Sequence, residues 1–253
     1  MKNPKLIFIP GWGTNSSIFK AVRDKLKMQS ICIEWWNCLS DNVNSNALYL
    51  ELESAIDPVV IVGWSLSGMI ALSAVIKYQK KISSLFLIST TPRMIGDEDY
   101  CGVNEHIIKA MIRKLKRNPV ETLEDFFTLC TDVQETQNIA SLQTIRSNKK
   151  NSYIFDLLNT AIKIKKEHLL AGLLYLKNSD LRNELGKVNI PVRIIHGQKD
   201  RVINIKNGIY LSKNLPLAEI KILKDSEHLF FHKNPSFLVN ELSNFINKTV
   251  SVD

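Results

Sequence analysis

Short apolar runs alternate along the chain with longer stretches in which apolar residues recur at helical spacing. Most of the short runs are continuous stretches of Val, Ile, Leu and Phe, a pattern typical of strands that helices bury on both faces. The alternation predicts an α/β fold, with a mainly parallel sheet of at least six strands flanked by helices. The predicted strands are Lys5–Pro10, Ile31–Trp36, Val59–Trp64, Ser84–Ser89, Val192–His196 and Glu219–Leu223.

The segments between the strands predict helices. Those of the core are Ile18–Lys27, Ala47–Ile56, Leu66–Tyr78, Ile205–Asn214 and a last helix from Pro235 to about Lys248. Between Pro92 and about Lys187 the sequence has no further strand-like apolar runs, and only helical patterns are found. The helices predicted in this interval are Glu105–Arg117, Val120–Leu129, Thr136–Arg146, Ser152–Ile164 and Lys166–Leu176. We therefore predict one core, residues 1–92 and 188–253, with a helical lid inserted over residues 93–187.

The composition restricts the class of protein but does not indicate a reaction. The length of 253 residues and the hydrophobic content of 45% suffice for one sizeable core. The apolar run Leu6–Ile9 is too short for a signal-peptide core, and no segment approaches the roughly 20 apolar residues of a transmembrane helix. We therefore expect no membrane association and a cytoplasmic location. The cysteines form no C-x-x-C pair, which predicts neither a zinc site nor a disulfide framework; they are Cys32, Cys38, Cys101 and Cys130.

Residues 59–72 read as a buried strand, a tight turn and an apolar helix. Ser65 stands at the turn, with Gly63 two residues before it and Ser67 two residues after it. The G-x-S-x-G nucleophile elbow of α/β-hydrolases needs small residues at both places, because helix and strand pass close together. Serine departs from the strict pattern at the second place but is small enough for it. We predict Ser65 as a nucleophile and the backbone N–H of Leu66 as an oxyanion donor; the alternative is an ordinary buried serine.

The first predicted strand runs into the glycine-containing loop Gly11-Trp12-Gly13. In α/β-hydrolases a loop at this place supplies the second N–H group of the oxyanion hole. We therefore predict the backbone N–H of Trp12 as the second donor. Pro10 precedes the loop where many members have His, a change that leaves a main-chain donor intact. The alternative is an ordinary turn at a strand end, with Trp12 in the core.

A carboxylate and a histidine follow the last two predicted strands. Asp200 lies just beyond the fifth strand, at the sheet edge where catalytic groups gather in α/β folds. His228 follows the sixth strand, and the chain order Ser65, Asp200, His228 is that of an α/β-hydrolase triad. We predict His228 as general base, oriented by Asp200, with His232 as the fallback; the alternative for Asp200 is a surface turn. The histidines expected to have structural or surface roles are His106, His168 and His196.

Two motifs together extend the prediction beyond the fold. Residues 10–15 (PGWGTN) and 63–68 (GWSLSG) resemble the pimeloyl-[acyl-carrier protein] methyl ester carboxylesterases of biotin synthesis. In that family a Trp follows the oxyanion glycine and another precedes the nucleophile. Residues 172–182 resemble the family's lid exit, and residues 126–130 resemble a lid helix that lines the acyl pocket. The resemblance implies that the substrate contacts Trp12, Trp64, Leu66, Phe126, Phe127 and Cys130.

The chain departs from that family at two points. Ser67 replaces the second elbow glycine, and the lid arginines are not matched one for one. Asp125 precedes Phe126 where a basic residue is expected. The resemblance therefore supports an esterase more firmly than it supports a carrier-linked substrate.

The net charge of +8 does not by itself indicate a partner, but the places where basic residues cluster can do so. In the predicted helix over residues 105–117, Ile107, Met111 and Leu115 share one face. A second face of that helix carries Lys109, Arg113, Lys116 and Arg117. Acyl carrier proteins are strongly acidic, so this basic face is a candidate docking surface for one; the alternative is a solvated face. No aromatic–basic interleaving accompanies the charge, and we predict no nucleic-acid partner.

The motifs and the resemblance predict carboxylic-ester hydrolysis through an acyl-enzyme, without a metal or an organic cofactor. The expected reaction converts pimeloyl-[acyl-carrier protein] methyl ester to pimeloyl-[acyl-carrier protein] and methanol, and we expect the enzyme to be a monomer. Other enzymes of the same fold stay open: a thioesterase, a broad carboxylesterase or a menaquinone-pathway lyase. A non-catalytic binding protein is the alternative of a different class, although such a module would not need to retain all three predicted triad residues.

Overall fold

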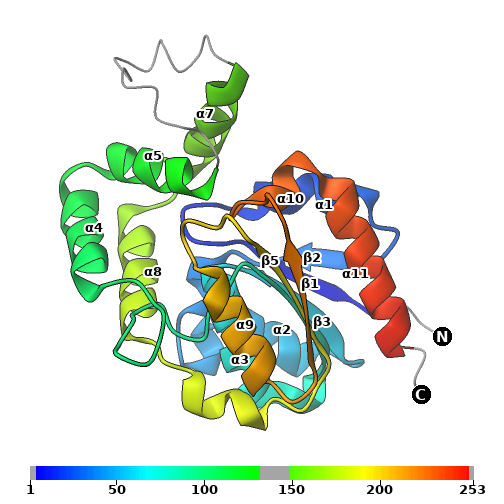
Figure 1. The fold of residues 1–253 in the computed structure, drawn as a ribbon. Helices are drawn as coiled ribbons and strands as arrows, with labels where there is room; N and C mark the ends of the chain where they lie inside the picture. Colours follow the sequence, from blue (N-terminus) through cyan, green and yellow to red (C-terminus); the bar gives the residue numbers. More distant parts are fainter. Residues whose placement is uncertain (1–3, 132–148, 251–253) are drawn as a thin grey trace.

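The computed structural model describes residues 4–131 and 149–250. Within them, six strands form one sheet in the order β2-β1-β3-β4-β5-β6, and every neighbouring pair is parallel (Figure 1). The predicted α/β fold is confirmed. The strands are β1 (Leu6–Ile9), β2 (Ser30–Cys32), β3 (Val59–Trp64), β4 (Ile82–Ile88), β5 (Val192–Gly197) and β6 (Ala218–Leu223).

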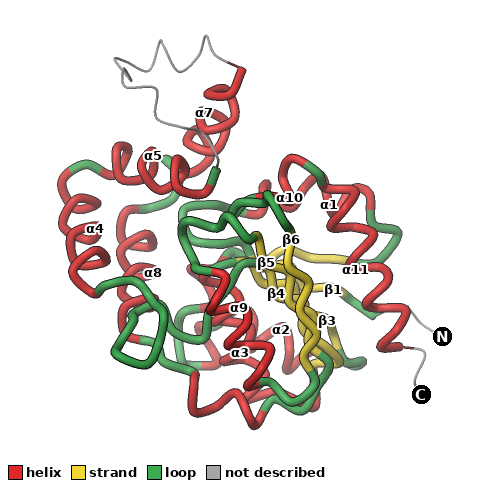
Figure 2. Tube along the Cα trace, in the orientation of Figure 1, coloured by secondary structure: helices red, strands yellow, loops and turns green. Residues whose placement is uncertain are grey.

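Helices cover both faces of this sheet, as Figure 2 shows. They are α1 (Lys20–Lys25), α2 (Ala47–Ser54), α3 (Leu66–Tyr78), α9 (Ile205–Asn214), α10 (Phe230–Lys233) and α11 (Pro235–Val250). On one face α1 packs against α11, and on the other α3 and α9 pack against the strands. Strands β1 and β3 are buried along their whole length, which explains their continuous apolar sequences.

Four described helices lie between β4 and β5: α4 (Glu105–Arg117), α5 (Pro119–Cys130), α7 (Lys149–Ala161) and α8 (Lys166–Asn178). They stand together beside the sheet in Figure 1. The Asn104 side chain accepts from the N–H of His106 and so caps α4, and Pro119 occupies the first turn of α5, where its missing N–H costs nothing. The predicted helix over residues 136–146 lies outside the described residues. The division into a core and a lid stays a prediction.

Two predicted elements differ from the structure. The strand predicted over residues 31–36 is shorter, because Trp35 begins a 3₁₀ turn in which its indole N–H donates to the Thr14 carbonyl over 2.9 Å. The helix predicted over residues 18–27 is a 3₁₀ turn followed by a short α1 that ends where Leu26 becomes extended. The 3₁₀ turns are η1 (Ser16–Phe19), η2 (Trp35–Cys38), η3 (Val43–Ser45), η4 (Gln79–Lys81) and η5 (Arg182–Lys187). Among the described residues, no helix combines the length and apolar character needed to cross a membrane.

Candidate active site

Ser65 occupies a strained turn between β3 and α3. Its φ of 58° and ψ of −122° lie in a region that non-glycine residues rarely adopt and that recurs at functional sites. Gly63 makes the turn possible, because a Cβ at that position would lie 2.6 Å from the Ser67 carbonyl oxygen. This is the backbone geometry of a nucleophile elbow, with the serine at the carboxyl end of a buried strand and at the start of a helix.

The serine at the second small position of the elbow connects two loops. The hydroxyl of Ser67, which is fully buried, donates to the carbonyl of Pro10, directly before the Gly11-Trp12 turn. On the other side of the elbow, the Thr90 hydroxyl donates to the Ser65 carbonyl over 2.6 Å. The departure from the strict glycine pattern therefore links the elbow to the loop after β1. The sequence indicated only that Ser67 is small enough for the elbow, because a hydrogen bond to a distant loop leaves no local pattern.

Asp200 and His228 form a buried pair. His228 Nδ1 lies 2.7 Å from Asp200 Oδ2, and both side chains are fully excluded from solvent. Because the carboxylate accepts, Nδ1 carries the proton and Nε2 is the basic nitrogen. Burial alone would raise the pKa of Asp200, but the neighbouring His228 and His196 outweigh it and hold the pKa below its ordinary value. His228 Nε2 is buried and has no hydrogen-bond partner among the described residues.

His228 lies beside the elbow. The Trp64 indole N–H donates to the His228 carbonyl over 3.1 Å, and the two rings are 5.3 Å apart between centroids. The loop that carries Asp200 is joined to the loop that carries His228, because the N–H of Lys199 donates to the Ser226 carbonyl over 2.9 Å. Gly197 permits this approach, since a Cβ there would collide with that carbonyl oxygen. Three segments far apart in sequence therefore meet at one end of the sheet.

The two predicted oxyanion donors belong to the loop after β1 and to the start of α3. Leu66 is the first residue of α3, and the first N–H groups of a helix have no acceptor inside it. Trp12 is 1% exposed, and its indole is fixed by a 2.8 Å hydrogen bond from Nε1 to the Leu169 carbonyl and by an edge-on contact with Phe126. The side chain of Trp12 thus ties the loop after β1 to α8 and α5.

A cavity of about 740 Å³ opens beside Ser65. Its lining is mostly apolar, and its size falls in the range of small-molecule sites. Trp12 and Phe126, both predicted to contact the substrate, lie on its wall. The segment after β4 and the turn after Asp200 also line it, and neither was predicted from the sequence. Those loops have no periodic pattern that could have indicated them. The lining includes Trp12, Ser65, Met94, Val103, Asn104, Ile107, Ile108, Met111, Lys114, Asp125, Phe126, Leu129, Leu173, Leu176, Arg201 and Val202.

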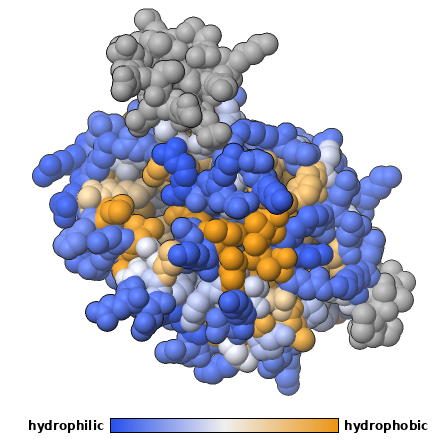
Figure 3. All heavy atoms as spheres, in the orientation of Figure 1, coloured by the Kyte–Doolittle hydropathy of each residue, from blue (hydrophilic) through white to orange (hydrophobic). Residues whose placement is uncertain are grey.

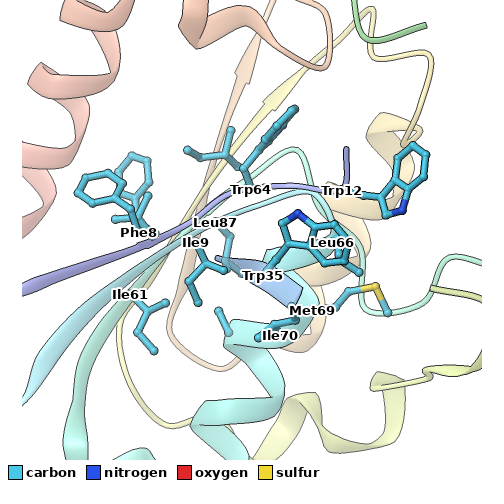
Figure 4. Packing of buried hydrophobic residues seen from close by; sticks show 14 of the residues in the cluster. Phe8, Ile9, Trp12, Trp35, Ile61, Trp64, Leu66, Met69, Ile70 and Leu87 are labelled. Atoms are coloured by element: carbon cyan, nitrogen blue, oxygen red, sulfur yellow. The ribbon is translucent and has the colours of Figure 1, made fainter. Parts of the chain in front are cut away.

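Four of the residues predicted to contact the substrate do not line this cavity. Trp64, Leu66, Phe127 and Cys130 are fully buried in the core; Figure 4 shows the first two among its packed side chains. Phe127 follows Phe126 in α5, and consecutive helical side chains point about 100° apart, so only one of them reaches the cavity. Substrate contact by these four residues stays a prediction.

The predicted basic face of α4 points away from the cavity. Arg113, Lys116 and Arg117 are exposed and form no ion pair with a described residue, whereas Lys109 pairs with Glu105 over 2.7 Å. Figure 3 shows mainly hydrophilic side chains along the edge of the molecule where α4 lies in Figure 1. Ile108 and Leu115 of α4 are buried, and Ile108 also lines the cavity, together with Ile107, which is 58% exposed.

Three of the other histidines have contacts of their own. The ring of His232 packs on Tyr153 with centroids 4.4 Å apart, and burial lowers its pKa. His168 stacks on Trp36 with centroids 5.5 Å apart. His196 is fully buried next to Asp200, a contact that the sequence analysis did not foresee.

The chain belongs to the α/β hydrolase fold family, whose model matches residues 4–235. It is similar to the pimeloyl-[acyl-carrier protein] methyl ester esterase of Vibrio vulnificus (strain CMCP6), with 25% identity across 98% of this chain and 96% of the relative. The enzyme of that name from Wigglesworthia glossinidia brevipalpis is 26% identical across 96% of this chain and 93% of the relative. The resemblance inferred from the two Trp-containing motifs is thus confirmed, and family and relatives together identify the chain as a hydrolase.

Solved structures support the same fold. The bromoperoxidase from Bacillus anthracis superposes with a TM-score of 0.82 at 17% identity, covering 97% of this chain and 92% of that chain. An esterase from Exiguobacterium antarcticum has a TM-score of 0.78 at 16% identity, with the same coverage of both chains. At these identities the likeness concerns the fold alone.

Proposed function

We propose that the chain is a serine carboxylesterase in which Ser65 is the nucleophile, His228 the general base and Asp200 the acid that orients it. One observation carries this proposal: a serine in a strained strand-to-helix turn directly follows Trp64, whose indole contacts the His228 of a buried His–Asp pair, and the same serine borders a mostly apolar cavity. A binding module would not need this combination, because the strain at Ser65 and the burial of Asp200 both cost stability.

In the proposed reaction, His228 Nε2 takes the proton of the Ser65 hydroxyl as the oxygen attacks the ester carbonyl. The N–H groups of Trp12 and Leu66 stabilise the oxyanion, each contributing on the order of 3 kcal/mol to lowering the barrier. His228 then returns the proton to the leaving methanol, and an acyl-enzyme remains. Water repeats the same steps and releases the acid. Asp200 holds the tautomer in which Nε2 is basic.

The proposed substrate is the methyl ester of pimeloyl-[acyl-carrier protein]. The names of the similar esterases, which the chain matches over nearly their whole length, support it. The cavity is also suitable, because its apolar wall matches a methylene chain and Ser65 stands on that wall. The cavity lining also contains polar side chains, among them Lys114 and Arg201. These side chains suit the polar part of the substrate that links the acyl chain to the carrier protein.

The proposed surface for the carrier protein is the outward face of α4, formed by Lys109, Arg113, Lys116 and Arg117. Three of these cations have no carboxylate partner among the described residues, so their charge is available to an acidic protein. Other residues of the same helix line the cavity, which brings a carrier bound there close to the active-site entrance.

A charge-reversal variant tests this surface. Changing Arg113, Lys116 and Arg117 to Glu is expected to raise KM for the carrier-linked ester, to leave kcat nearly unchanged, and to leave turnover of a small free ester unaffected. The matched control changes Lys25, Lys27 and Lys80 to Glu; these exposed residues precede β2 and β4, at the opposite edge of the sheet. An equal loss of kcat/KM on both substrates would indicate that the variant has a damaged lid. Unchanged kcat/KM on both would mean that this face of α4 is only solvated and binds no carrier protein.

The substrate itself is tested by incubating the protein with carrier-linked pimeloyl methyl ester and with free short-chain methyl esters. The proposal predicts carrier product lighter by one methylene group, at a kcat/KM well above that of the free esters. Ser65→Ala is expected to leave less than about a thousandth of the wild-type kcat. Comparable rates on all esters would favour a broad carboxylesterase, and activity only on a carrier thioester bond would favour a thioesterase.

A further inference from the structure

Asp200 is held by two histidines rather than one. His196, the next-to-last residue of β5, is fully buried, and its Nε2 lies 2.9 Å from the Ile203 carbonyl oxygen. The same nitrogen lies 3.3 Å from Asp200 Oδ2, the oxygen that accepts from His228. Both neighbours are hydrogen-bond acceptors, so Nε2 of His196 carries a proton, which it donates to the Ile203 carbonyl with Asp200 Oδ2 in close electrostatic contact. Asp200 Oδ2 thus lies between two imidazole N–H groups.

His196 also closes the turn that carries Asp200. Asp200 Oδ1 accepts from the N–H groups of Val202 and Ile203 over 2.9 and 2.8 Å, which folds the turn around the carboxylate. The bond from His196 to the Ile203 carbonyl ties the far end of that turn back to β5. The carboxylate therefore has a fixed rotamer, and it cannot move relative to β5 without breaking one of these bonds.

Helix α9 supports the His196 ring from the other side. A Cβ at Gly208 would lie 2.6 Å from His196 Nδ1, so a glycine at this point lets the helix pack directly on the ring. Nδ1 is buried and has no partner among the described residues, so the ring is bound through Nε2.

We propose that His196 is a positioning residue for catalysis, which fixes Asp200 and shares its Oδ2 with His228. The proposal rests on the proposed triad. The N–H of His196 partly neutralises the negative charge of Asp200 Oδ2. The carboxylate therefore stabilises less strongly the imidazolium that His228 becomes during the reaction. In return, the carboxylate is pre-oriented, and no reorganisation is needed when His228 accepts the proton.

This arrangement has a consequence for the pH dependence. Among the described residues, the titratable groups that face the Asp200 carboxylate are His228 from the loop after β6, His196 from β5 and Cys130 from α5. Burial raises the pKa of Cys130, so its thiol stays neutral in the working range. Glu227, beside His228, is paired with Lys233 over 2.9 Å. Removing the N–H of His196 therefore leaves more carboxylate charge for His228 and moves the acid limb of kcat/KM to higher pH.

The test compares His196→Phe, which keeps a ring but has no N–H, with His196→Gln, whose amide N–H can replace Nε2. On a small free ester we expect kcat of the Phe variant to fall about 10- to 100-fold with KM unchanged, and its acid limb to move to higher pH. The Gln variant is expected to recover most of the rate and the wild-type acid limb. A folded Phe variant with wild-type kcat and pH profile would overturn the proposal, as would equal losses in both variants with an unchanged acid limb.

A second variant covers the case in which the Phe protein does not fold. Gly208→Ala presses on the ring without removing it and improves helix propensity, so kcat is expected to fall without KM rising. Gly186→Ala is the matched control, because a Cβ there meets nothing within 4 Å. Wild-type kcat in Gly208→Ala would overturn the proposal. Labelling of wild-type Ser65 by a fluorophosphonate distinguishes failure of the proposed triad from failure of the proposed role of His196. If Ser65 is not labelled, the triad is wrong; if it is labelled, the variants test only the role of His196.

Discussion

The hydrogen bond from the Ser67 hydroxyl to the Pro10 carbonyl joins the nucleophile elbow to the loop that carries the proposed Trp12 donor. Ser67→Ala removes the donor and leaves the buried backbone of Pro10 without it. We expect two effects from this change. The free energy of unfolding should fall, and so should kcat, because the loop after β1 is no longer fixed to the elbow.

The sizes of both effects follow from the burial. A buried acceptor that loses its donor costs about 1–3 kcal/mol, and for a chain of 253 residues each kcal/mol lowers Tm by about 2–4 °C. Ser67 positions the oxyanion loop but does not itself bind the oxyanion. The loss in kcat is therefore expected to be on the order of tenfold, below the roughly 100- to 1,000-fold that follows removal of an oxyanion donor. KM should hardly change, because the oxyanion exists only in the transition state and intermediates.

The assay combines urea denaturation with steady-state kinetics on a free ester. Ser84→Ala is the matched control: its hydroxyl is equally buried, in β4, but has no hydrogen-bond partner among the described residues, so removing it breaks no bond. Destabilisation of Ser67→Ala with wild-type kcat would refute the link between elbow and oxyanion loop. Equal destabilisation of the Ser84 and Ser67 variants would refute the argument from the hydrogen bond itself.

Three further predictions concern the triad and the core. Asp200→Asn should lower kcat roughly 10⁴-fold in a folded protein, because the amide no longer holds the His228 tautomer; retained turnover would exclude Asp200 as the acid. Phe127→Ala should lower the free energy of unfolding by about 3–5 kcal/mol in urea titrations, since the ring is fully buried; a change under about 1 kcal/mol would contradict its place in the core. Burial lowers the pKa of His232 from 6.5, so the unfolded chain binds more protons just below that pH, and wild-type stability should decline as pH falls through this window. His232→Phe should lessen this decline while keeping the activity that His228→Ala abolishes; the reverse pattern of activities would make His232 the base.

The sequence predicted the features that depend on local pattern. A continuous apolar run, a turn of small residues and an apolar helix specify a strand–turn–helix unit wherever they occur, so Ser65 could be placed before its neighbours were known. Asp200 and His228 could be placed at the same sheet edge, because the carboxyl ends of parallel strands meet there. The structure brings these two side chains to hydrogen-bond distance, and their catalytic roles stay predictions.

The features that the sequence did not predict depend on long-range packing. Helical periodicity identifies an apolar face in α5, but it does not tell which residue meets the cavity, and Phe126 rather than Phe127 does so. The segment after β4 lines the cavity without any periodic pattern. His196 was expected to be structural, and only the folded turn reveals that its N–H reaches the same carboxylate oxygen as His228. The shortening of β2 likewise depends on the indole of Trp35, which turns inward to a distant carbonyl.

Ser65 is proposed as a nucleophile that His228 activates. The most direct measurement is labelling of the folded protein with a fluorophosphonate, followed by intact mass and peptide mapping. We predict a single adduct on Ser65 that is absent from Ser65→Ala and forms far more slowly in His228→Ala, because the hydroxyl is weakly nucleophilic without its base. The absence of an adduct from the folded wild-type protein, or an adduct on another residue that survives in Ser65→Ala, would contradict the account.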